Sequence, residues 1–210
     1  MVFLVVGLSY LLGSIPTSII VGRIFFGKDP RQHGSLNAGG TNAFRVFGWK
    51  AGTVVTFIDI GKGVVATLLI SRLAAGSIPT DIARLLSGCS AILGHIWTVF
   101  AGFRGGKGVG TAAGMLFGLH PVALVVSVMI FIVVLLSTGF VSMGSMTAGA
   151  AFPMTLLVMG LTGSEVSNLY LFATVALAFL IVFTHRKNIR RLLSGEEQRF
   201  QHLMVFRRRR

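Results

Sequence analysis

Long apolar runs alternate with short polar breaks from one end of the chain to the other. A membrane-spanning helix needs about 20 mostly apolar residues. The candidate spans lie at 3–22, 52–70, 82–101, 122–137, 143–161 and 169–184, with a shorter apolar run at 110–119. The pattern predicts an all-α polytopic membrane protein with about seven transmembrane helices, one of them short, joined by glycine-rich cytoplasmic loops.

The breaks between these runs are short, apart from a polar stretch at 23–51 and a basic, amphipathic end at 185–210. The sequence shows no internal repeat and no soluble second domain. We therefore expect one integral membrane domain over 1–210, in which 185–210 is a basic cytoplasmic tail.

Charge is scarce and unevenly placed. Only 12% of the residues are charged, whereas soluble domains carry about 25%. Of the 19 Lys and Arg residues, 16 lie in 23–51, 102–109 and 185–210. Because cytoplasmic loops collect Lys and Arg, these segments are expected to face the cytoplasm, with the N-terminus outside. This orientation accounts for the net charge of +13 without a nucleic-acid partner.

That orientation requires the run at 110–119 to be a short passage, although ten residues of helix rise only about 15 Å. Whether this run fully spans the membrane stays open. Within it Gly110, Gly114 and Gly118 recur every fourth residue, a spacing that lets helix backbones approach closely. Packing therefore accounts for these glycines.

Other features narrow the class of protein. Cys89 is the single cysteine, which excludes a disulfide framework or a cysteine-rich metal site. No credible metal cluster is visible, and no cofactor is expected. The N-terminal apolar run has no basic residue before it and no clear cleavage site after it, so it is read as a retained helix rather than a signal peptide.

The stretch GFRGGKGVGTAAG at 102–114 is rich in glycine and carries Arg104 and Lys107. A P-loop needs four residues between its glycines and a Ser or Thr after the lysine, and here the stretch has three residues and Gly108. The dinucleotide pattern fails in spacing too. Exposed N–H groups of a glycine-rich turn, followed by a helix N-terminus, still form an anion cradle. Anion binding is therefore the preferred interpretation.

The stretch GSLNAGGTNAFR at 34–45 has similar chemistry. Its hydrogen-bonding side chains are neutral or cationic, namely Ser35, Asn37, Thr41, Asn42 and Arg45. A polar turn with a helix cap is the alternative, because Ser, Asn and Gly are ordinary turn residues. Two such loops on one face suggest two anionic groups.

Further polar residues flank or interrupt the apolar runs. In THRKNIRRL at 184–192, His185 and Asn188 share a face if the helix continues, whereas the cations there are read as a membrane anchor and the terminal RRRR as attraction to lipid headgroups or a disordered tail. Asp59 and Lys62 lie within a span, either as an ion pair or in a polar role beneath the site. His95 and Trp97 suit an interfacial belt as well as chemistry.

With these motifs the sequence resembles the bacterial acyl-phosphate:glycerol-3-phosphate acyltransferases of the PlsY type. The likeness covers nearly the whole chain and rests on GSIPT at 13–17, GSLNAGGTN at 34–42, D-x-x-KG at 59–63, GHIWTVFAGFRGGKGVGT at 94–111 and HRKNIRRL-x-x-G-x-E at 185–197. The chain departs from the family where Leu36–Gly40 replaces Gly-Asn-Pro-Gly-Ala, where Trp97-Thr98 replaces Phe-Pro, and where Arg104 replaces lysine.

The resemblance implies transfer of a fatty acyl group from acyl phosphate to the 1-hydroxyl of glycerol 3-phosphate, giving lysophosphatidic acid and phosphate in a bacterial inner membrane. It implies catalytic roles for Ser35, Arg45, Lys107 and His185. It implies substrate-binding roles for Asn37, Gly40, Thr41, Asn42, Arg104, Gly105, Gly106, Gly108, Ser142 and Asn188. The donor phosphate is assigned to Ser35, Thr41, Asn42, Ser142 and 104–108, and the acceptor to Arg45, Arg104, His185 and Asn188.

The proton acceptor stays open between His185, Asp59 and a substrate phosphate. The H-x-x-x-x-D pair of other acyltransferases is absent, because the aspartate position after each histidine holds Ala38, Phe100, Val125, Arg190 or Arg207. The alternatives are a transporter for a phosphorylated solute, whose broken helices can also point at an anion, and a lipid-binding scaffold. The expected partners are acyl phosphate, glycerol 3-phosphate and membrane lipids.

Overall fold

The computed structural model describes residues 1–205, and its regular elements in that range are all helical. The chain divides into two compact units, Met1–Leu119 and His120–Arg210. In the described range, five helices are long and apolar enough to cross a membrane, or six if a bent pair is one span. The expected all-α class is confirmed, whereas the count of about seven and the single-domain organisation stay predictions. The RRRR segment at 207–210 lies outside the described residues.

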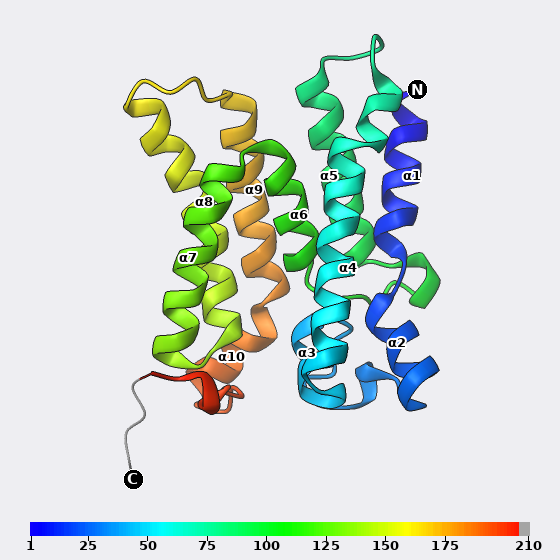
Figure 1. The fold of residues 1–210 in the computed structure, drawn as a ribbon, viewed down its shortest axis with the longest axis vertical. Helices are drawn as coiled ribbons and strands as arrows, with labels where there is room; N and C mark the ends of the chain where they lie inside the picture. The colour runs from blue at the N-terminus through cyan, green and yellow to red at the C-terminus, as the bar shows by residue number, and fades with distance from the viewer. Residues whose placement is uncertain (206–210) are drawn as a thin grey trace. The chain divides into compact units, whose positions relative to one another are not determined.

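The first unit contains six α-helices (Figure 1). They are α1 (Val2–Ser14), α2 (Thr17–Phe26), α3 (Gly40–Phe47), α4 (Trp49–Leu68), α5 (Thr80–Ile96) and α6 (Val109–Leu119). Short 3-10 turns lie at Pro30–Gln32, Ile70–Ala74 and Val99–Ala101. At 11 residues, α6 rises about 16 Å, so its full passage through a membrane stays a prediction.

The expected helix at 3–22 is broken at Ile15 and Pro16, where α1 ends and α2 begins. Proline has no N–H and disfavours a helical conformation in the residue before it. The break exposes the Ile15 carbonyl, which accepts a hydrogen bond from Lys62 Nζ of α4 at 2.5 Å. The same oxygen accepts from Thr17 N at 2.9 Å, so two donors satisfy the carbonyl at the break.

Glycines let the helices of this unit approach closely. A Cβ at Gly114 of α6 would lie 2.0 Å from the Ile60 carbonyl oxygen of α4, and one at Gly63 of α4 would lie 2.0 Å from the Thr111 oxygen. Gly110 and Gly118 also face α4, close to Asp59 and Thr67. The expectation that the spaced glycines of α6 serve close packing is confirmed.

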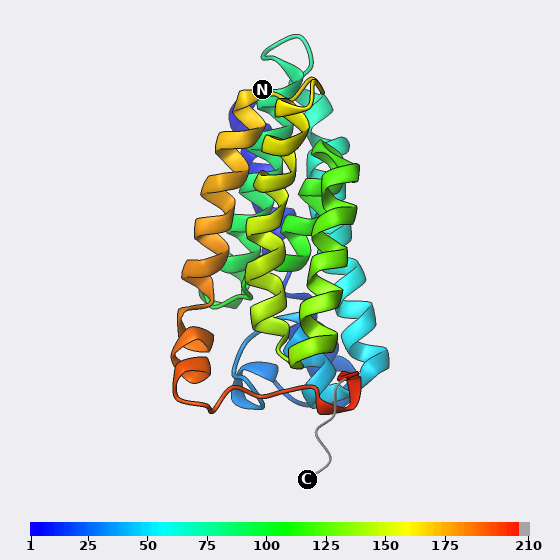
Figure 2. The ribbon, with the colours of Figure 1, turned by 90° about the vertical axis from the view of Figure 1, so that its left-hand side faces the viewer.

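The second unit contains α7 (Pro121–Thr138), α8 (Val141–Leu161), α9 (Asn168–Thr184) and α10 (Arg186–Leu193), followed by a 3-10 turn at Gln201–Leu203. Figure 2 shows α7, α8 and α9 side by side. The chain bends by 57° between α9 and α10. It then runs back to the end of α7, where Phe200 N donates to the Gly139 oxygen at 2.9 Å.

An ion-pair latch holds the segment after α2. The Asp29 carboxylate accepts from Arg31 Nε and Nη2 at 3.0 and 2.8 Å and from Arg23 Nη2 at 3.1 Å. Arg31 Nη1 also donates to the Ala101 oxygen at 2.9 Å. The Arg31 guanidinium, aided by Arg23, holds the pKa of Asp29 well below its ordinary value. The latch therefore ties residues 29–31, just before the glycine-rich stretch at 34–45, to the turn that precedes the glycine-rich stretch at 102–108.

We expect Gly63→Ala to lower the thermal unfolding midpoint of the detergent-solubilised protein, because its methyl group meets the Thr111 carbonyl of α6. Overpacking of this kind costs about 1–3 kcal/mol. Gly61→Ala is the matched control, since nothing lies within 4 Å of a Cβ at Gly61. Equal midpoints for the two variants would contradict the close α4–α6 contact.

The ion-pair latch at Asp29 predicts how the stability of the protein depends on pH. A carboxylate whose folded pKa is depressed adds stability above its unfolded pKa and loses it as the pH falls toward the folded value. Wild type should therefore exceed Asp29→Asn in stability by about 1–3 kcal/mol at neutral pH. This difference in stability should become smaller as the pH falls below 3.8, the ordinary pKa of an aspartate. Thermal unfolding from pH 3 to pH 7 measures it, with exposed Glu165→Gln as control; a gap that does not change with pH would exclude the latch.

Candidate active site

Asn42 organises the first glycine-rich loop. Its Nδ2 donates to the carbonyl oxygens of Pro30 and Asn37 at 2.7 and 3.0 Å, and its Oδ1 accepts from Ser35 N at 2.8 Å. The side chain is buried, so each of these bonds satisfies a group shielded from water. For Asn42, these bonds match the alternative interpretation of the stretch as a polar turn. A role of Asn42 as a substrate contact stays a prediction.

The same loop carries an exposed leucine in a strained conformation. Leu36 has φ 60° and is 64% exposed, and a bulky residue rarely adopts this left-handed region. On its far side the loop runs into α3, where a Cβ at Gly40 would lie 2.3 Å from Thr56 Oγ1 of α4. Ser35, Asn37 and Thr41, in and beside this segment, are half-buried.

The second glycine-rich loop closes over the C-terminal end of α5. Gly105 N donates to the Ile96 oxygen at 3.1 Å and Gly106 N to the His95 oxygen at 3.0 Å. These bonds satisfy carbonyls that a helix end leaves unpaired, so the two N–H groups serve the fold. The backbone N–H groups that remain for the expected anion site are those from Lys107 into the first turn of α6. The leading N–H groups of a helix have no partner within the helix.

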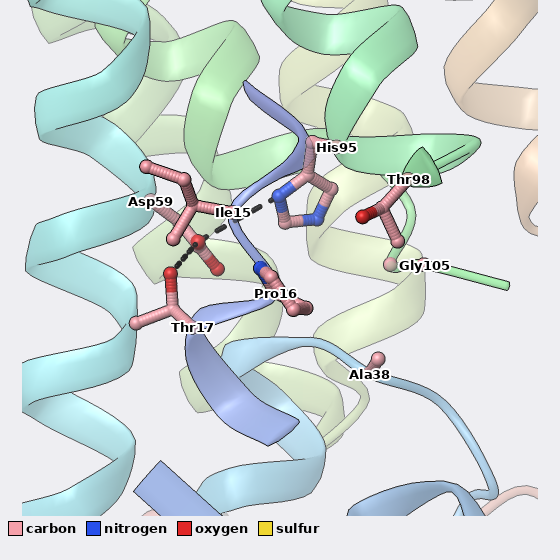
Figure 3. A pocket seen from close by; sticks show the side chains of 9 residues that line it. Ile15, Pro16, Thr17, Ala38, Asp59, His95, Thr98 and Gly105 are labelled. Atoms are coloured by element: carbon pink, nitrogen blue, oxygen red, sulfur yellow. Dashed lines mark hydrogen bonds and ion pairs between the residues drawn. The ribbon is translucent and has the colours of Figure 1, made fainter. Parts of the chain in front are cut away.

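The two loops meet at Gly106. A Cβ there would lie 2.2 Å from His95 Nε2 and 3.1 Å from the Ala38 carbonyl oxygen of the first loop. A small pocket opens beside this contact (Figure 3). It is lined by Ile15, Pro16, Thr17, Ala38, Asp59, His95, Thr98, Gly105 and Gly106. Segments far apart in the sequence thus converge on one polar hollow.

Asp59 is the charged centre of this hollow. Its Oδ1 accepts from Thr17 Oγ1 at 3.0 Å and from Lys62 Nζ at 2.7 Å, and His95 Nδ1 lies 3.6 Å away. The ion pair expected between Asp59 and Lys62 is present and almost fully buried. A buried charge needs such compensation, since an unpaired one is very costly.

Sequence reasoning missed two members of this cluster. Thr17 lies in the GSIPT motif, but no role was assigned to it, and His95 was left between a membrane belt and chemistry. The signal was present in each case as a polar residue beside a helix break within an apolar run. Only the fold shows that both face Asp59.

In the second unit, Glu197 gathers two residues of the expected site. Its Oε1 accepts from Ser142 Oγ at 2.8 Å and from Asn188 Nδ2 at 2.7 Å, while Oε2 accepts from Arg191 Nε at 2.8 Å. Burial alone raises the pKa of Glu197, but these hydrogen bonds outweigh it and hold the pKa below its ordinary range. Glu197 was overlooked, although it is an acid at the end of a strongly basic segment.

His185 lies at the bend between α9 and α10. Its Nδ1 faces the Ile181 oxygen at 2.8 Å, and its own carbonyl accepts from Ile189 N at 2.9 Å. His185 and Asn188 are both buried. The helix does not continue straight, yet the bend keeps these two side chains inside the unit.

The cations of the expected site differ in exposure. Arg45 of α3 and Lys107 are half-buried, whereas Arg104 is exposed. Among the described residues, no group of three or more His, Cys, Asp or Glu could hold a metal ion. In the first unit the two glycine-rich stretches therefore carry the cations Arg45, Arg104 and Lys107, whereas the charged residue that lines the pocket itself is Asp59.

Comparison with known proteins identifies the family. The family model described as glycerol-3-phosphate acyltransferase matches residues 3–195. A glycerol-3-phosphate acyltransferase of Pelodictyon phaeoclathratiforme is 45% identical, covering 93% of this chain and 94% of that one. One from Chlorobium phaeobacteroides (strain DSM 266) is 44% identical, covering 94% and 95%.

Two crystal structures of PlsY, an integral membrane glycerol 3-phosphate acyltransferase, share the fold. The glycerol 3-phosphate form has a TM-score of 0.83 and 35% identity, covering 96% of each chain. The lysophosphatidic acid form has a TM-score of 0.81 and 34% identity, covering 97% of each. Together with the family match, these likenesses show that the chain is a membrane protein of the glycerol-3-phosphate acyltransferase family.

Proposed function

We propose that this acyltransferase uses a fatty acyl phosphate as donor, acylates the 1-hydroxyl of glycerol 3-phosphate, and releases lysophosphatidic acid and inorganic phosphate. The observation that carries the proposal is the meeting of two glycine-rich loops at Gly106 and Ala38. Each loop brings its own cations, Arg45 in one case and Arg104 and Lys107 in the other. Two substrates that each bear a phosphate match two cationic loops.

In the proposed reaction the glycerol oxygen attacks the acyl carbonyl carbon. A carbon–oxygen ester bond forms, the bond between the acyl carbon and the phosphate oxygen breaks, and phosphate leaves with the bonding electrons. An acyl phosphate is a mixed anhydride with a good leaving group, so positioning and charge stabilisation supply most of the catalysis. Lys107 and Arg45 are assigned to the charge that develops on carbonyl and phosphate oxygens.

For the proton of the hydroxyl, the contacts of Asp59 weigh against a role as base. Its carboxylate already accepts from Thr17 and Lys62 and is buried, whereas a base must reach the proton that it removes. We infer that a substrate phosphate takes the proton. Ser35, His185, Asn188 and Ser142 are then assigned to orienting the two substrates.

We infer that the whole chain, 1–210, acts as one acyltransferase domain, because the family model runs across both compact units. The proposed location is the bacterial inner membrane, with the site facing the cytoplasm and the N-terminus outside. Its support is the grouping of 16 basic residues in three segments. A donor dissolved in the membrane then meets an acceptor dissolved in the cytosol at the inner face.

The donor is tested directly with purified protein. Phosphate should be released only when an acyl phosphate and glycerol 3-phosphate are both present, with lysophosphatidic acid formed in equal amount. Acyl-CoA should not replace the donor. Turnover with acyl-CoA would overturn the donor assignment, and uptake of glycerol 3-phosphate into liposomes without product would favour a transporter.

Removal of a loop cation should abolish most of the activity. We expect Arg45→Ala and Lys107→Ala each to lower kcat/KM by about 10²–10³-fold, as for the loss of one donor to a developing negative charge. The control is Lys50→Ala, which removes an exposed cation that lies over Trp49 just beyond α3. The unfolding midpoint of all three proteins is measured alongside. Wild-type kinetics in either loop variant would refute the assignment.

A further inference from the structure

The imidazole of His95 lies between the buried charge pair of α4 and the second glycine-rich loop. Its Nδ1 is 3.6 Å from Asp59 Oδ1, and the other ring nitrogen points the opposite way, into the pocket (Figure 3). The residue is 8% exposed. The ring therefore lies between the charge pair of α4 and the pocket.

Asp59, which faces Nδ1, sets the orientation of the His95 ring. Asp59 is held by Thr17 of α2 and Lys62 of α4, and Lys62 also donates to the Ile15 carbonyl at the break between α1 and α2. The charges of Asp59 and Lys62 balance each other. The Asp59 carboxylate faces Nδ1, so this edge of the ring is held toward α4 and Nε2 is directed away from it. The ring therefore has one preferred orientation.

His95 contacts the second loop in two ways. Its backbone oxygen accepts from Gly106 N at 3.0 Å, and its Nε2 occupies the space next to Gly106, where a Cβ would lie 2.2 Å away. The same Cβ would lie 3.1 Å from the Ala38 oxygen. Gly106 is thus confined between the imidazole and the first loop.

We propose that His95 is a positioning residue for acyl transfer: its ring, oriented by Asp59, holds Gly106 against Ala38 and so sets the distance between the two phosphate-binding loops. The inference rests on the proposed function, because the loops must bind the two phosphates for their spacing to matter. His95 itself touches no reacting atom in this scheme. Displacement of a binding group by about 1 Å can cost 10²-fold in rate, so a loop that is held loosely weakens catalysis.

The first test is the kinetics of His95→Asn. Asparagine retains a polar atom toward Asp59 but lacks the atoms that confine Gly106. We expect the KM for at least one phosphate substrate to rise by about 10-fold or more, as for a misplaced binding group. A general loss of folded protein would instead lower the apparent kcat at unchanged KM. The matched control is His120→Asn, at the start of α7 and outside the site.

The second test is a double-mutant cycle. Gly106→Ala places a methyl group where Nε2 lies, so it should lower kcat/KM strongly in the presence of His95. In the His95→Asn background the space is open, and the same change should cost at least about 5-fold less. Contacting residues show such coupling, whereas distant and independent ones add. Equal losses in both backgrounds would overturn the proposal.

Asp59→Asn gives an independent measurement, because it keeps the His95 ring and removes the charge that faces it. Since it also leaves the buried Lys62 unpaired, the measurement is made on protein whose unfolding midpoint shows that it is folded. The proposal requires this variant to raise the same KM as His95→Asn. It also requires the combined variant to be no worse than the poorer single one. An unchanged KM in Asp59→Asn would also overturn it.

Wild type separates this inference from the proposed function. If wild type fails to turn over acyl phosphate with glycerol 3-phosphate, the donor assignment has failed. If wild type is active while the His95 and Asp59 variants keep its KM values, only the positioning role has failed.

Discussion

The ion pair between Asp59 and Lys62 is the constraint on which the first unit depends. Two opposite charges within a membrane span are tolerated only if each is compensated. Here Thr17 completes the shell of Asp59, and the Ile15 carbonyl, released by the proline break, completes that of Lys62. The pair therefore joins α2 and α4 at the height where α1 ends. The imidazole of His95 then extends it to the loop at Gly106.

Close backbone contact is the second requirement. Between apolar helices in lipid there is little hydrophobic driving force, so packing of small residues and hydrogen bonds must hold them together. Gly63 and Gly114 let α4 and α6 touch, and Gly13 and Gly94 do the same for α1 and α5. The two helices that carry Asp59 and His95 are thereby fixed by contacts that admit no side chain. A polar pocket can then be held to a tolerance that flexible loops alone do not provide.

Both glycine-rich loops use part of their hydrogen-bonding capacity on their own shape. Asn42 ties the first loop to backbone groups around it, and the N–H groups of Gly105 and Gly106 cap α5. In the second unit, Glu197 does the same for Ser142 and Asn188. Residues that look like ligand-binding groups in a motif thus divide into those that build the site and those left to face the substrate. In the proposed acyl transfer between two phosphate-bearing molecules, rigid loops convert binding into positioning.

Much of this protein could be read from local pattern, because membrane spans need long apolar runs and anion-binding turns need glycine with nearby cations. The helical class, the close packing of Gly110, Gly114 and Gly118, and the Asp59–Lys62 pair follow from such spacing. The break at Pro16 was passed over, because the apolar run continues through it. Only the folded chain shows three further sets of contacts. Asp59 is in contact with Thr17 and His95, Gly106 lies next to Ala38, and Glu197 binds both Ser142 and Asn188. These contacts join residues from separate helices and loops, and their formation depends on helix packing, about which spacing along one segment carries no information.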